Sequence, residues 1–129
     1  MDKAELPFLS ATELASLIKS KEVSPVEATE AYLERIPQLD DKLNSYITVT
    51  ADRAMADARK AEQEITSGKY RGPMHGVPIG IKDQVYTKGI LTTGGSTILK
   101  DFVPDEDATV VTKLNEAGAV LLGKLNMSE

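Results

Sequence analysis

The sequence predicts an α/β fold in which N-terminal helices are followed by the first βαβ part of a sheet. Two nearly continuous apolar runs, at 77–81 and 119–123, have the pattern of strands buried on both faces of a parallel sheet. A helix is predicted between them at about 108–117, so the three elements follow in the order of a right-handed βαβ unit. The 129 residues include 41% hydrophobic and 27% charged side chains, the balance of one globular domain.

The predicted elements begin with a helix over about 11–20. The segment 10–13 reads Ser-Ala-Thr-Glu, which has the spacing of a capping box. Ser24 and Pro25 mark a second helix start, because proline at the first helical position removes no helical hydrogen bond. We expect this second helix to end at Pro37, since proline disfavours a helix interior.

A third helix, at 51–67, completes a helical region of about 1–68. The segment at 45–49 before it is β-branched and aromatic, which is typical of a strand. Gly68 follows the helix at the usual position of a C-terminal cap. Small apolar residues recur at helical spacing, so we expect this helix to have a packing role only. These residues are Ala54, Ala58, Ala61 and Ile65.

The remaining region, about 69–129, is predicted to start the sheet. Pro78 in the first apolar run favours an edge strand or the first position of a strand, since proline cannot donate a hydrogen bond to a neighbouring strand. Asp105 or Asp107 is expected to cap the helix that follows, and Gly118 lies just beyond its end.

The predicted parallel sheet is too small to be stable alone, because such sheets need more than two strands and both faces covered. We therefore expect residues 1–129 to be the N-terminal part of a single domain that continues beyond Glu129. The alternative is a complete small α+β domain in which 45–49 pairs as a third strand.

Composition argues against several classes of function. The formal net charge is −5, with 15 basic and 20 acidic side chains, and no basic stripe favours direct nucleic-acid binding. The absence of cysteine excludes a disulfide framework, a zinc ribbon, an iron–sulfur site and a thiol nucleophile within this chain. No apolar run approaches the roughly 20 residues of a membrane span, and no signal peptide is evident, so we expect a cytoplasmic protein.

Two motifs are weak candidates for a site. His75 is the only histidine and lies in a glycine-flanked loop, but the sequence nominates neither a nucleophile nor an orienting group for it. The segment 94–97, Gly-Gly-Ser-Thr, could bind an anion, but it lacks the lysine of a P-loop. We therefore expect an ordinary loop histidine and no nucleotide site.

Lys82 is the stronger candidate. It directly follows the first apolar run, and on the two-residue period of a strand it shares a face with Gly80, while Val77, Ile79 and Ile81 share the other. Burial of an unpaired ammonium is costly. Lys82 therefore either reaches solvent, or pairs with the adjacent Asp83, or is buried in neutral form and able to act as a base.

Two motif blocks in the second half of the chain are distinctive. The first is the segment 72–83, Gly-Pro-Met-His-Gly-Val-Pro-Ile-Gly-Ile-Lys-Asp. The second comprises the segments 107–111, Asp-Ala-Thr-Val-Val, and 118–127, Gly-Ala-Val-Leu-Leu-Gly-Lys-Leu-Asn-Met. The first block resembles the opening of the domain of the amidase signature family, and the second resembles its continuation. The resemblance covers essentially the whole chain, and two blocks at this separation are highly specific.

The resemblance implies an amide-bond hydrolase or amidotransferase built on a mixed β-sheet wrapped by helices, without metal or organic cofactor. It implies a serine nucleophile, a second serine in a cis peptide bond, and a lysine that takes a proton from that second serine. Lys82 matches the lysine. The serines and the oxyanion-binding amides are implied for motifs beyond Glu129, because Ser96 and Ser128 do not stand in such motifs. We therefore expect the 129-residue chain alone to be inactive.

Three functions remain open. The expected parent activity is cleavage of a carboxamide through an acyl-enzyme by a stand-alone amidase. The first alternative is the glutaminase-type A subunit of a glutamyl/aspartyl-tRNA amidotransferase, which would release ammonia from glutamine in a heteromeric complex. The second is a non-catalytic module whose acidic helices bind a partner. The expected partners are thus a small-molecule amide, the rest of the amidase domain, and either a second copy or amidotransferase subunits.

Overall fold

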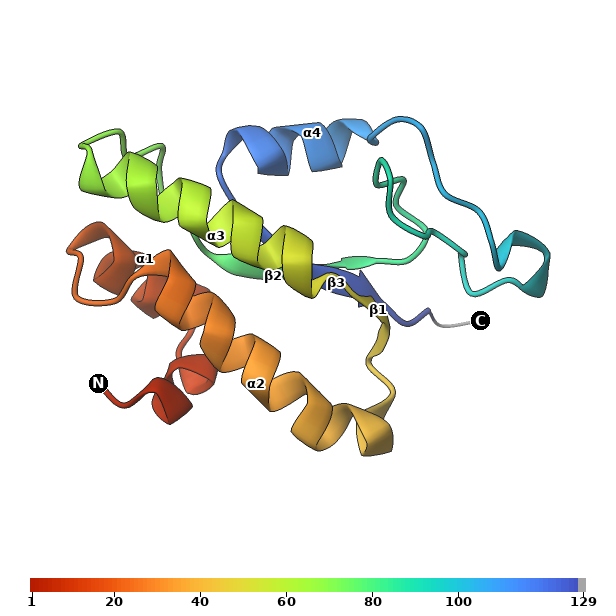
Figure 1. Cartoon of the computed structure of the whole chain (residues 1–129), viewed down its shortest axis with the longest axis horizontal. Coiled ribbons are helices and arrows are strands. Elements are labelled where there is room, and N and C mark those ends of the chain that lie inside the picture. Colours follow the sequence, from red (N-terminus) through yellow and green to blue (C-terminus); the bar gives the residue numbers. More distant parts are fainter. Residues whose placement is uncertain (128–129) are drawn as a thin grey trace.

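The computed structural model describes residues 1–127 and shows a three-stranded mixed sheet with helices on both faces (Figure 1). The two short 3₁₀ helices are η1 (Lys3–Phe8) and η2 (Thr97–Leu99). The α-helices are α1 (Ala11–Lys19), α2 (Pro25–Leu43), α3 (Ala51–Thr66) and α4 (Thr109–Glu116). The strands are β1 (Tyr46–Val49), β2 (Pro78–Lys82) and β3 (Val120–Leu125).

The sheet has the order β1-β3-β2. β2 and β3 are parallel neighbours joined through α4, so the predicted βαβ unit is confirmed. β1 pairs with β3 antiparallel, which is the third-strand pairing that the small-domain alternative contained. Pro78 is the first residue of β2, and β2 lies at the edge of the described sheet, as its proline predicted.

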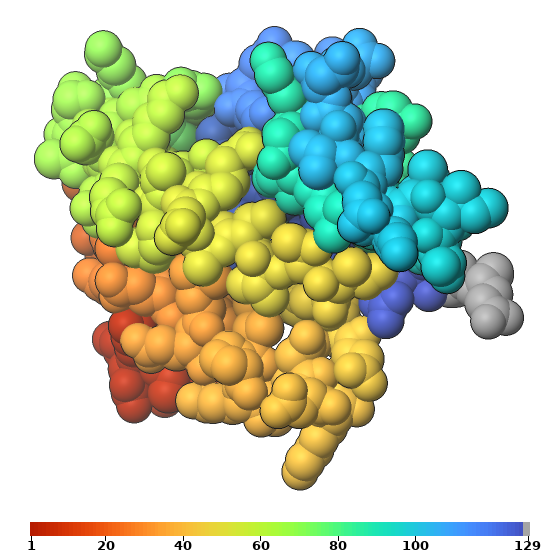
Figure 2. All heavy atoms as spheres, turned by 45° about the vertical axis from the view of Figure 1, so that its right-hand side comes forward, coloured from red at the N-terminus to blue at the C-terminus, as the bar shows by residue number. Residues whose placement is uncertain are grey.

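Helices from different parts of the chain cover the two faces of the sheet. On one face, Ala54 and Ala58 of α3 pack with Val120 and Leu122 of β3, and α2 lies against them. On the other face, Val111 of α4 packs with apolar residues of β2 and β3. In Figure 1, α3 crosses in front of the sheet, α4 lies above it, and α1 and α2 lie below. The space-filling view shows β3 largely hidden beneath α3 and the connection between β2 and α4 (Figure 2).

The helix starts follow the sequence signals, but one predicted helix end is wrong. Ser10 and Glu13 form the reciprocal capping box, and α2 starts after Ser24. α2 does not end at Pro37, however, and continues to Leu43. None of the helices within residues 1–127 combines the length and apolar character needed to span a membrane.

The last turns of α2 are held by groups that follow Pro37. Asn44 adopts a left-handed conformation with φ 51°, and its amide donates to the Asp40 carbonyl at 2.7 Å. The Asp40 carboxylate also accepts the Ser45 amide at 2.8 Å. Proline within a helix removes one hydrogen bond and crowds the carbonyl four residues earlier, and these C-terminal bonds stabilise the turns that follow it.

The expected aspartate cap of α4 is also wrong. Ala108 occupies the cap position without a side-chain bond, while the Asp107 carboxylate accepts the Lys88 amide at 2.7 Å. Asp105 does not cap the helix either. Gly118 does lie just past the helix end, with φ 81°.

β3 skips one residue relative to β2. Ile79 is opposite Leu121, whereas the next residue, Gly80, is opposite Gly123. Such a bulge reverses which face later side chains occupy. A regular strand would place Lys124 on the face of Val120, but the skipped residue moves it to the face of Leu121.

Candidate functional site

Lys82 lies at the carboxyl end of β2, beside the carboxyl end of the parallel strand β3. Val77 and Ile81 are buried, and Gly80 and Lys82 are exposed. The predicted alternation is confirmed for 79–82, because Ile79 and Ile81 pack together against α4. It is wrong for Val77, which precedes β2 and packs in a separate core cluster with residues of α1 and α3. The expectation that this strand is buried on both faces is wrong for β2, whose open face carries Lys82, and right for β3, of which five of the six residues are buried.

A main-chain carbonyl holds the Lys82 amine. Its Nζ donates to the carbonyl oxygen of Asn126 at 3.1 Å. Asn126 is itself fixed, because its amide donates to the Ser45 carbonyl at 2.8 Å and its side-chain amide donates to the Asn44 carbonyl at 2.9 Å. The chain just after β3 thus gives the amine a defined direction on an open face of the sheet.

A glycine turn in the connection after β2 lies close to the ends of β2 and β3. Gly94 and Gly95 have positive φ, 60° and 71°, and the Gly94 amide donates to the Asp83 carbonyl at 2.9 Å. A Cβ atom on Gly95 would lie 3.1 Å from the Cβ of Met127. This turn therefore packs closely against the chain that follows β3, within the same region as Lys82.

The expected alternative pairing of Lys82 with Asp83 does not occur. The Lys82 side chain reaches the Asn126 carbonyl, whereas Asp83 is completely buried and lies 3.8 Å from the Nζ of Lys124. Burial lowers the pKa of the Lys124 amine, and the Asp83 carboxylate opposes that change. The desolvated lysine that the sequence suggested at position 82 is therefore found at position 124.

Sequence reasoning missed Lys124 as a residue of interest. The available signal was a charged residue directly after the apolar run of β3, since lysine is almost never fully buried without a partner. Lys124 is 0% exposed. The bulge that moves Lys124 to the Leu121 face is a property of strand pairing, so the sequence did not show which face the side chain occupies.

His75 is a buried structural histidine. It is 1% exposed, its Nδ1 accepts the Arg71 amide at 3.0 Å, and its Nε2 lies 3.5 Å from the Glu64 carboxylate. Burial lowers the pKa of His75, against the opposing effect of Glu64. Burial would raise the pKa of Glu64, but the hydrogen bond and charge of Arg71 outweigh it and lower that pKa. These contacts bind the loop before β2 to α3.

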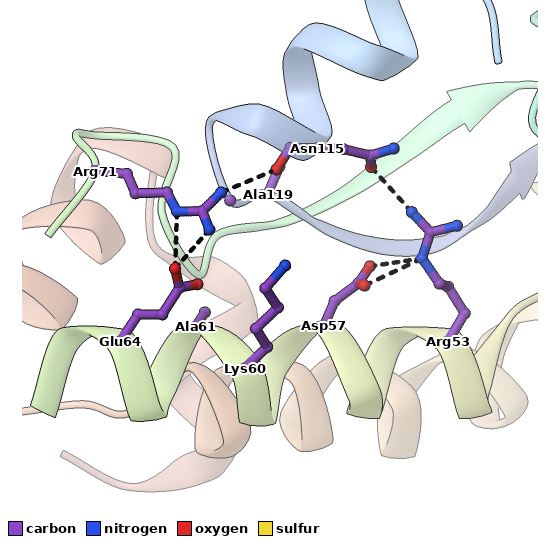
Figure 3. Close-up of a pocket in the computed structure, with 9 residues that line it drawn as sticks. Arg53, Asp57, Lys60, Ala61, Glu64, Arg71, Asn115 and Ala119 are labelled. Atoms are coloured by element: carbon purple, nitrogen blue, oxygen red, sulfur yellow. Dashed lines mark hydrogen bonds and ion pairs between the residues drawn. The ribbon is translucent and has the colours of Figure 1, made fainter. Parts of the chain in front are cut away.

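A polar cavity of about 250 Å³ lies between α3 and the end of α4 (Figure 3). Arg53 pairs with Asp57 at 3.0 Å and also donates to the Asn115 side chain. Arg71 pairs with Glu64 and donates to the carbonyl groups that end α4. Two arginines and two carboxylates of the lining bind one another across the gap between the helices, while the exposed Lys60 also lines the cavity. We therefore interpret the cavity as a contact between α3 and α4.

Of the two serines considered in the sequence analysis, the structure describes only Ser96. Ser96 caps η2 by accepting the Ile98 amide at 3.2 Å. Ser128 lies outside the described residues. The described site therefore consists of Lys82, the Asn126 carbonyl and the glycine turn.

Comparison with known proteins identifies similar chains. A family model described as Amidase matches residues 27–129. The chain is 51% identical over 125 residues to the A subunit of the glutamyl-tRNA(Gln) amidotransferase of Geobacter sp. (strain M21), covering 97% of this chain and 26% of that protein. It is 46% identical over 129 residues to a putative amidase AmiD of Mycobacterium bovis (strain ATCC BAA-935 / AF2122/97), covering 100% of this chain and 27% of that protein.

A solved structure shows the same arrangement. The native peptide amidase from Stenotrophomonas maltophilia matches with a TM-score of 0.88 and 36% identity, over 96% of this chain and 26% of that chain. This chain thus spans about a quarter of the length of the relatives that it matches. Within the matching part, this chain is similar to those relatives in sequence and to the peptide amidase in backbone structure as well.

Proposed function

The chain belongs to the amidase family, and on this premise we propose that it forms the N-terminal part of a serine hydrolase that cleaves carboxamides through an acyl-enzyme. Residues 1–129 would then be part of a single amidase domain, with the helical region at about 1–68 and the start of the sheet at about 69–129. The observation that carries the proposal is the position of Lys82 on the open sheet face, at the carboxyl ends of two parallel strands. In open α/β sheets, ligands bind at such ends.

Lys82 is proposed to act as the proton acceptor. In neutral form its amine would take a proton from a serine held in a cis peptide bond. That serine would take the proton of the nucleophilic serine as its oxygen attacks the carbonyl carbon of the amide. Protonation of the leaving amine along the reverse path would complete acylation, and water would then hydrolyse the acyl-enzyme. Both serines would come from beyond residue 129.

Local geometry supports this role for Lys82. The Lys82 amine donates one hydrogen to the Asn126 carbonyl at 3.1 Å. This bond orients the amine, and with it the lone pair that would accept a proton. The exposed side chain is accessible to groups that approach the open face. The assignment of the residue as a base rests on the family resemblance, and its place in the fold is compatible with it.

The test is replacement of Lys82 by alanine in a complete amidase that contains residues 1–129. Acylation should fall by a factor on the order of 10² to 10⁴, the usual contribution of general base catalysis. The acylation rate is measured from the burst of amine released from an anilide substrate. Lys113→Ala, at an exposed lysine of α4, is the matched control and should keep the rate. An unchanged burst in a folded Lys82→Ala protein would show that Lys82 is not the proton acceptor.

The glutaminase-type A subunit is the second candidate, favoured by the 51% identity to an amidotransferase subunit. In that case the protein would release ammonia from glutamine, and the release would depend on the other amidotransferase subunits. Ammonia measured from glutamine with and without those subunits separates the two activities. A stand-alone amidase should act on simple carboxamides without a partner.

A further inference from the structure

The chain contains a buried ion pair that the proposed reaction does not use. Lys124 and Asp83 are both 0% exposed, and their Nζ and Oδ1 atoms are 3.8 Å apart. The Lys124 amine donates to the Val85 carbonyl at 2.9 Å and to the Thr92 hydroxyl at 2.8 Å. The second Asp83 oxygen accepts the Thr93 amide at 3.0 Å and the hydroxyl of the same residue. Among the residues that the structure describes, Asp83 Oδ1 has no hydrogen-bond donor, so Lys124 is its compensating charge.

This pair lies behind the sheet as seen from Lys82. In the parallel register, Lys124 is opposite Ile81, and Lys82 is opposite Leu125. Ile81 is buried on the α4 face. Gly80, which shares the Lys82 face, would meet Leu125 if it carried a Cβ atom. The two lysines therefore occupy opposite faces, and no side chain of the pair touches the Lys82 amine.

The residues of the pair are nevertheless bonded to the backbone that directly follows Lys82. The Asp83 amide donates to the Leu125 carbonyl at 3.0 Å, and the Gly94 amide donates to the Asp83 carbonyl at 2.9 Å. The Val85 amide donates to the Lys82 carbonyl at 3.0 Å, while the Val85 carbonyl accepts the Lys124 amine. The pair therefore fixes the turn that leaves β2 and joins it to the end of β3.

We propose that Lys124, together with Asp83, is a positioning residue for the Lys82 amine. This inference rests on the proposed function. A buried ion pair contributes little net stability, because desolvation offsets the attraction, and apolar residues of similar size would serve the fold as well. What apolar residues would not supply is the set of directed bonds from Lys124 to Val85 and Thr92. These bonds hold the end of β2 against the end of β3, and with it the angle between Lys82 and the Asn126 carbonyl.

The test uses a complete amidase that contains residues 1–129. Lys124→Met removes the bonds and leaves Asp83 uncompensated, so both the thermal midpoint and kcat should fall. The paired variant Asp83→Asn/Lys124→Met removes both charges, and the carboxamide oxygen introduced at position 83 could still accept the Thr93 amide. We expect this paired variant to recover the thermal midpoint while kcat stays reduced on the order of 10²-fold, with KM little changed, since a misplaced catalytic group costs about that much. Activity is followed as ammonia released from glutamine, or from benzamide if glutamine is not cleaved.

Two controls keep the outcomes separate. Val111→Ala truncates a buried residue of the same face and should lower the thermal midpoint while keeping kcat. Lys82→Met should be inactive, and if it were active the proposed function itself would fail. With Lys82→Met inactive, a paired variant that recovers both the thermal midpoint and kcat would overturn the positioning role alone. If Lys124→Met does not fold, the paired variant still decides the question.

Discussion

Replacement of Gly118 by alanine should destabilise the protein strongly. Gly118 has φ 81°, and a Cβ atom there would lie 3.1 Å from the Cγ and Nε2 atoms of His75 and closer still to Cδ2. The left-handed conformation costs about 1–2 kcal/mol for a residue with a side chain. Displacing a fully buried ring costs a further 1–3 kcal/mol or so. We therefore expect the free energy of unfolding to fall by about 2–5 kcal/mol.

The chain supplies a matched control for this prediction. Gly68 also has positive φ, 89°, but a Cβ atom there would meet nothing within 4 Å. Gly68→Ala should therefore cost only the conformational part, about 1–2 kcal/mol. Both variants are compared by urea unfolding, with equal slopes as a check that the unfolded states are comparable. Equal losses for the two variants would refute the argument that Gly118 is required by its contact with His75.

Two other outcomes follow from the described contacts. Burial lowers the pKa of His75 from its usual 6.5, so below that pH the unfolded state binds more protons than the folded state. The free energy of unfolding should therefore be highest above about pH 6.5 and should decline toward pH 5. The pKa of the Glu64 carboxyl is lowered from 4.5, so this group stays ionised between pH 5 and 6.5. His75→Gln should therefore reduce the fall of the thermal midpoint between pH 6.5 and pH 5. Separately, the purified 129-residue chain should not hydrolyse an anilide, because the proposed nucleophile and oxyanion donors are not among its residues. Turnover that Lys82→Ala abolishes would contradict this.

The sequence predicted elements whose signals are local. The reciprocal bonds of Ser10 and Glu13 require only one turn of chain, and the same holds for the start at Ser24. The end of α2 was mispredicted because the helix continues past Pro37 to a left-handed cap at Asn44, where Asp40 bonds the chain that follows. A proline disfavours a helix locally, and groups several residues away decide whether the helix continues.

The candidate site was predictable only in part. The strand period placed Lys82 at the end of β2 and on the face of Gly80, as the structure has it. Its exposure was not evident, because an apolar run does not show whether both faces of the strand are covered. Burial of Lys124 depends on the residue that β3 skips opposite β2, which is a property of strand pairing rather than of either segment.

The most direct test of the account is Lys82→Arg in a complete amidase that contains residues 1–129. Arginine keeps the positive charge and a donor for the Asn126 carbonyl, but the guanidinium stays protonated and cannot accept a proton near neutral pH. We predict a folded protein, with the wild-type thermal midpoint, whose acylation rate is reduced nearly as much as that of Lys82→Ala. Amide hydrolysis by the arginine variant at close to the wild-type rate would contradict the assignment of Lys82 as the base.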